Sequence, residues 1–62
     1  MITATKLNDK DVAINNDLIE FIESNPDTTI TMTTGRKIIV KESVEDIIEK
    51  ITAFKQRIKN FQ

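Results

Sequence analysis

The chain has no cysteine, histidine, tryptophan or tyrosine, and only one glycine and one proline among its 62 residues. Without cysteine no disulfide can form, and without cysteine and histidine the usual zinc ligands are missing. Disulfides, metals and self-association are the usual reinforcements of domains this small. Because self-association is the one that remains, we expect a homo-oligomer. The lack of cysteine also fits a reducing compartment.

The groups needed for catalysis are missing as well. Ser43 has no histidine in the chain to activate it, and the lone Gly35 cannot form a glycine-rich phosphate loop. Four carboxylates lie between residues 42 and 49, but they surround an expected helix start, where acidic residues are favourable in any case. We predict that the protein is not an enzyme and has no catalytic residue, cofactor, metal site or small-molecule substrate.

Long hydrophobic runs are also absent, since no stretch approaches the roughly 20 apolar residues that span a bilayer. Residues 1–6 have neither a basic region nor an apolar run, so we expect no secretory signal. The sequence therefore predicts a cytoplasmic protein whose contact with a membrane is at most peripheral.

Charge is close to balanced overall, with a net value of −1, but the two halves differ. Residues 1–35 hold two basic and six acidic residues, a net charge of −4, whereas residues 36–62 hold seven basic and four acidic residues, a net charge of +3. Such asymmetry can steer a partner to one end of the molecule, although we favour the simpler explanation, a solvated and salt-bridged surface.

Strand patterns fill residues 2–41. Residues 2–7 and 11–14 form a predicted hairpin whose turn contains Asn8 and Asp9, which tolerate the left-handed backbone region. Residues 28–33 alternate threonine with apolar residues, and after a turn at Gly35 the chain returns over residues 36–41. Four to five short antiparallel strands are therefore expected.

Residues 18–23 fit two structures. At a period of two, Ile19 and Phe21 face one side and Leu18 and Ile22 the other, whereas a helix would place Leu18, Phe21 and Ile22 together after an Asp17 cap. We favour a strand because the run is short and a turn at residues 24–27, with Pro26 presetting φ, follows soon after.

The period changes to that of a helix over residues 44–60. Ser43 and Asp46 have the spacing of a capping box, acidic residues lie early and basic residues late. A heptad-like apolar stripe contains Val44, Ile47, Ile51, Phe54, Ile58 and Phe61. Ile48 is expected to widen the stripe where it packs on the sheet. The fold class is thus α+β, a small antiparallel sheet followed by one C-terminal helix, in a single domain of residues 1–62.

The helix is expected to be longer than the sheet is wide. No glycine or proline interrupts residues 44–62, and these 19 residues would extend roughly 28 Å as a helix, whereas strands of five or six residues extend about 17–20 Å. The last turns should then project past the sheet as an apolar strip with basic flanks, a candidate interface with a second copy or another protein. Fraying and packing on the domain's own core stay open. The interface residues are Phe54, Ile58, Phe61, Lys55, Arg57 and Lys59.

Nucleic-acid binding is the alternative to a protein–protein interface, since small barrels bind RNA with stacked aromatic residues and a basic groove. The aromatic residues here are only Phe21, Phe54 and Phe61, two of them on the apolar stripe. The acidic first half would also repel phosphate. The sequence therefore disfavours nucleic acid as a partner.

The ordered combination of these segments resembles the FlbD family of flagellar, or swarming motility, proteins. The similarity runs through Leu7-Asn8, the Ile-Glu-rich segment at residues 19–23, Pro26-Asp27-Thr28, Thr34-Gly35-Arg36-Lys37, and residues 40–48. One departure is visible, because Asp9 stands where the family pattern has glycine.

The resemblance implies a non-enzymatic accessory of flagellar motility, linked to motor power through contacts with the stator or other basal-body components. It implies a location at the cytoplasmic face of the flagellar base. A regulatory nucleic-acid-binding module that affects flagellar gene expression is the alternative function.

Overall fold

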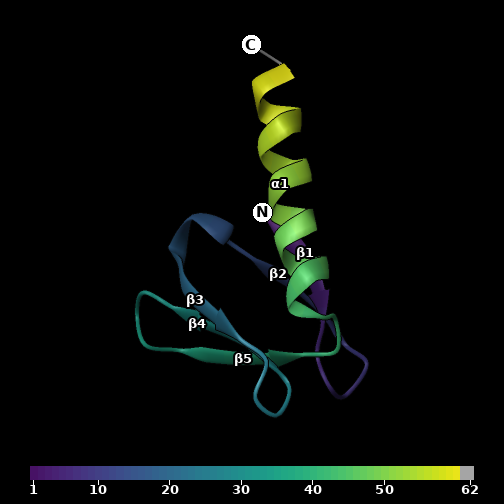
Figure 1. Ribbon diagram of the computed structural model, residues 1–62, viewed down its shortest axis with the longest axis vertical. Helices are drawn as coiled ribbons and strands as arrows, with labels where there is room; N and C mark the ends of the chain where they lie inside the picture. Colours follow the sequence, from purple (N-terminus) through teal and green to yellow (C-terminus); the bar gives the residue numbers. More distant parts are fainter. Residues whose placement is uncertain (61–62) are drawn as a thin grey trace.

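The computed structural model describes the backbone of residues 1–60 and the side chains of residues 1–56. This part of the chain forms short strands followed by one long helix (Figure 1). The α+β arrangement confirms the expected fold class. The elements in order are β1 (Ile2–Thr5), β2 (Asp11–Ile14), the 3-10 turn η1 (Asn16–Leu18), β3 (Ile19–Glu23), β4 (Thr28–Met32), β5 (Lys37–Val40) and α1 (Val44–Asn60).

The strands make two antiparallel sheets, one of order β1-β2 and one of order β3-β4-β5. An isolated bridge between Lys6 and Val40 joins them. Beside it, the Lys41 amide donates to the Thr5 carbonyl at 2.8 Å. The sheets therefore meet at the end of β1 and the end of β5, and they diverge from that corner.

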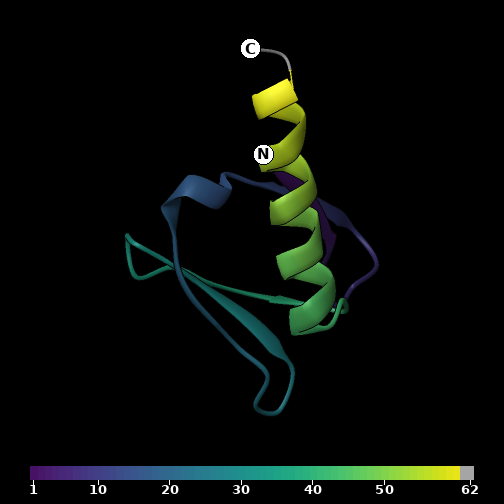
Figure 2. The same ribbon diagram turned by 45° about the horizontal axis from the view of Figure 1, so that its top comes forward.

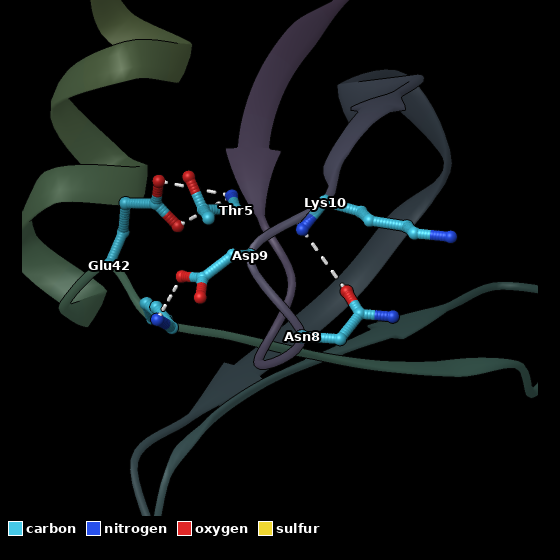
Figure 3. Close-up of polar contacts among 6 residues, drawn as sticks. Thr5, Asn8, Asp9, Lys10 and Glu42 are labelled. Atoms are coloured by element: carbon cyan, nitrogen blue, oxygen red, sulfur yellow. Dashed lines mark hydrogen bonds and ion pairs between the residues drawn. The ribbon is translucent and has the colours of Figure 1, made fainter.

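The two expected tight turns are confirmed. Asp9 has a φ of 69°, in the left-handed region that aspartate tolerates, and the Asn8 side chain accepts from the Lys10 amide at 3.1 Å (Figure 3). Gly35 has a φ of 91° and donates its amide to the Met32 carbonyl at 2.8 Å. In the remaining turn, the Asn25–Pro26 peptide bond is cis.

Residues 18–23, whose sequence fits both a strand and a helix, form a strand from Ile19 after a 3-10 turn that ends at Leu18, so the favoured strand is confirmed. The side chains do not follow the two faces expected of a regular strand, nor those expected of a helix. Ile19 pairs with Met32, but Phe21 pairs with Thr31, so Glu20 is an extra residue that makes a bulge. The bulge shifts the alternation by one position. Ile19 and Ile22 therefore pack against the core, whereas Phe21 lies on the outer face and is 45% exposed.

The core lies between the two sheets and the first turns of α1. Its buried residues are Ile2, Ala4, Ile14, Ile30, Met32, Val40 and Ile47. Ile51 and Phe54 continue the helix contact as half-buried residues.

The expectation for Ile48 is wrong, because its side chain is 51% exposed. The helix begins beside β1 and rises past both sheets instead of lying across them (Figures 1 and 2). Only a narrow stripe of the helix therefore meets the rest of the domain. The described molecule is accordingly elongated, with extents of 38 × 23 × 18 Å.

Candidate functional site

Ser43 caps the start of α1. The Ser43 hydroxyl accepts from the Asp46 amide at 3.1 Å, and the Ser43 carbonyl accepts from the Ile47 amide at 3.1 Å. The side-chain bond satisfies one of the amides that a helix start leaves without an intrahelical partner. The expected cap at Ser43 is thus confirmed.

The segment before the helix is tied to the end of β1. The Glu42 carboxylate accepts from the Thr5 amide through both oxygens, at 2.9 and 3.0 Å (Figure 3). Lys41 forms an ion pair with Asp9 in the β1–β2 turn. That pair is exposed and adds little stability, whereas the Glu42 contact satisfies a main-chain donor on the outer edge of β1.

Glu42 is also the residue in the described chain whose ionisation the fold clearly alters. Burial raises the pKa of its carboxyl. Two kinds of interaction outweigh that effect: hydrogen bonds from the Thr5 amide, the Thr5 side chain and the Glu42 amide, and the positive charge of Lys50. The net pKa lies below the ordinary value of 4.5. The charged form therefore holds the start of α1 against β1 at neutral pH.

The predicted interface residues fall in three groups. Phe54 is half-buried against the domain's own core, and Lys55 is exposed. Arg57, Ile58 and Lys59 lie in the last turns of α1, and their side chains are outside the described part. Phe61 lies outside the described residues altogether. An interface at the helix end therefore stays a prediction.

A basic groove that sequence reasoning missed lies between the β1–β2 hairpin and β5. Its larger part has a volume of about 380 Å³ and a neighbouring hollow about 200 Å³, and both are lined by Val12, Arg36 and Ile38. The larger part is also lined by Lys6, Leu7, Asn8, Lys37 and Ile39. Three cations and several apolar side chains thus share one surface.

Two segments quoted for the family resemblance, Leu7-Asn8 and Thr34–Lys37, border this groove from opposite sides. Their position beside each other follows from the Lys6–Val40 bridge, a contact between distant parts of the chain. Their presence in the family pattern was the one sequence signal that could have indicated the groove. Neither their spacing in the sequence nor a periodic pattern predicts that they lie side by side.

Two further observations concern the described residues. They contain no group of three histidine, cysteine, aspartate or glutamate side chains placed to hold a metal ion. Within the same part of the chain, no helix combines the length and the apolar character that crossing a membrane requires.

Comparison with protein families gives a match to the FlbD family, described as flagellar and swarming motility proteins, over residues 1–59. Comparison with curated proteins and with solved structures gives no significant match. The family match covers both sheets and almost all of the helix, so it includes the cap, the bridged corner and the groove. This chain therefore belongs to the FlbD family of flagellar and swarming motility proteins.

Proposed function

We propose that the protein is a non-enzymatic accessory of flagellar motility, which supports motor power through protein–protein contacts with the stator. The observation that carries the proposal is the family match across residues 1–59. The composition supports it, because a chain without histidine or cysteine lacks the commonest general base and the most reactive nucleophile. The proposed place of action is the cytoplasmic face of the flagellar base.

The projecting helix is the proposed contact surface. The narrow stripe by which the helix packs on the domain leaves Ile48 exposed, and Lys55 is exposed two and four residues before the basic positions Arg57 and Lys59. An amphipathic helix with one covered stripe has further surface to offer a partner. Basic residues at the helix end would suit an acidic partner surface.

Self-association belongs to the same proposal. A domain of this size gains stability by burying more apolar surface against a second copy. Sedimentation velocity should show a species larger than a monomer at tens of micromolar, an order of magnitude typical of modest interfaces. A monomer throughout would remove the homo-oligomer from the proposal.

The functional test is deletion of the gene in the source bacterium, with filament number and motor torque measured in the same cells. Lower torque with a normal number of filaments supports a motor accessory. Normal torque with fewer filaments indicates a role in assembly or expression and contradicts the proposal.

The second candidate is a regulatory nucleic-acid-binding module, and the basic groove with Lys6, Arg36 and Lys37 is the observation that favours it. A filter-binding titration across salt concentrations separates the two candidates. Phosphate contacts would give binding that weakens steeply as salt rises. No retention of single-stranded RNA or duplex DNA at low salt would eliminate this candidate.

A further inference from the structure

The groove is lined by residues of two strands, β2 from one sheet and β5 from the other. Val12, Ala13 and Ile14 of β2 are consecutive residues that line it, and so are Lys37, Ile38 and Ile39 of β5. Successive side chains of a strand point to opposite faces. Consecutive lining residues on β5 therefore fit a groove that reaches the edge of this strand, and β5 is an edge strand of its three-stranded sheet.

The hydrogen-bond pattern shows which main-chain groups face this seam from β5. The Met32 amide donates to the Arg36 carbonyl at 2.8 Å, in the same register that pairs Thr31 with Lys37. Antiparallel pairs alternate between bonded and non-bonded. The Thr31–Lys37 pair is therefore non-bonded, and the Lys37 N–H and C=O point away from β4.

On β2 the pattern gives the opposite result. The Lys6 amide donates to the Lys10 carbonyl at 2.8 Å, in the register that pairs Thr3 with Ala13, so the Ala13 main-chain groups point away from β1, whereas the end of β5 adjoins the outer edge of β1. The pattern explains the neighbouring contacts, because Thr5 likewise turns its amide and carbonyl outward, to Glu42 and Lys41. Among the described residues, the bridge that joins the sheets is at Lys6 and Val40, and no pairing of β2 with β5 accompanies it.

The side chains around the seam have one sign of charge. Lys6, Arg36 and Lys37 line it, and none of the described lining residues carries a carboxylate. Leu7 and Ile39, beside these cations, are 50% and 44% exposed. A ligand that fits would combine negative charge, apolar side chains and an extended main chain.

We propose that this groove binds an extended, acidic segment of a partner protein, which adds to the edge of β5 as a further strand. Main-chain pairing at Lys37 supplies the affinity, the apolar residues take alternate side chains, and the cations select carboxylates. Nucleic acid fits less well, because no aromatic side chain of the described residues lines the groove to stack a base. The inference depends on the groove alone and does not require the motor role.

The probe is a fluorescein-labelled octapeptide of alternating glutamate and valine, with both ends blocked, titrated with the full chain and followed by fluorescence anisotropy. Three ligands are compared with it: the lysine–valine peptide, the glutamate–valine peptide with alternate amides N-methylated, and oligouridine of similar length. Only the unmodified acidic peptide is expected to bind well. N-methylation removes the donors that strand pairing needs while it keeps the charge.

The variant Arg36→Glu/Lys37→Glu reverses two exposed cations of the groove and is expected to weaken peptide binding by about tenfold or more. The control is Lys50→Glu, an exposed cation on α1 outside both the groove and the predicted interface, which should leave binding within about twofold. Circular dichroism establishes that both variants fold. On the unmodified chain, amide chemical shifts should move for Val12–Ile14 and Lys37–Ile39 and stay constant along α1.

Several results would overturn the proposal. Equal binding of the lysine–valine or N-methylated peptide would contradict the charge or the strand-pairing argument. Undiminished binding by the groove variant, or shift changes confined to α1, would place the site elsewhere. Tighter binding of oligouridine, lost in the groove variant, would make the groove a nucleic-acid site. Because no flagellar component is used, each result is separate from the motor role.

Discussion

At the scale of single residues, the fold depends on a few positions whose surroundings leave little choice. Gly35 holds a φ of 91° at the β4–β5 turn, and Thr31 is 5% exposed although it lies on the outer face of β4. Among the residues that the structure describes, the Thr31 hydroxyl has no hydrogen-bond partner. Gly35 thus stabilises the fold because it tolerates the positive φ of the turn, whereas Thr31 destabilises it because its buried hydroxyl lacks a partner.

Replacing Gly35 by alanine should lower the free energy of unfolding by about 1 kcal/mol, because an L-residue is strained at positive φ. Space is not the cause, since a Cβ built there meets nothing within 4 Å. Urea denaturation would measure the loss, and Gly35→Asn should cost less because asparagine tolerates this region. Equal stability of the alanine variant would mean that the turn relaxes to another conformation.

Replacing Thr31 by valine should raise the free energy of unfolding by about 1 kcal/mol, since it keeps the shape and removes a buried hydroxyl without a partner. Thr29→Val is the matched control on the same face, because the Thr29 hydroxyl donates to the Asp27 carbonyl at 3.2 Å. That control should give no gain. A destabilised Thr31→Val protein would show that the hydroxyl is satisfied in solution.

At the scale of elements, local signals predicted the structure well and distant contacts escaped prediction. The β4–β5 hairpin follows from alternating threonines and a glycine turn, and α1 begins where Ser43 predicted it. The bulge at Glu20 could not be anticipated, because it exists only in the pairing of β3 with β4. The groove escaped for the same reason, since the Lys6–Val40 bridge brings its two sides together.

The joint between β1 and α1 predicts a dependence on pH. Glu42→Gln should lower the free energy of unfolding by about 1 kcal/mol at neutral pH, because a charge-assisted contact with the Thr5 amide is weakened. The folded-state pKa of Glu42 lies below the ordinary 4.5, so the stabilisation is present above that value and is lost as pH falls through the folded-state pKa.

The difference between the two proteins should therefore shrink as pH falls below 4.5. Urea denaturation at a series of pH values measures it, with Glu23→Gln on the exposed part of β3 as the control for a carboxylate without this contact. A difference that stays constant into the acidic range would contradict the assigned role of Glu42.

At the scale of the whole molecule, a small body carries a helix that extends beyond it (Figure 2). The body offers a basic groove, and the helix offers the predicted interface. The groove and the helix are thus two separate surfaces, each proposed to contact a partner.

The most direct measurement is the torque of single motors, from bead-labelled flagella, in a deletion strain that carries either the wild-type gene or a Lys55→Glu/Arg57→Glu/Lys59→Glu version. Immunoblotting confirms equal protein levels, and filaments are counted in each strain. We predict low torque in the deletion strain, recovery with the wild-type gene and poor recovery with the variant, all with normal filament number. Unchanged torque in the deletion strain would contradict the proposed role in the motor.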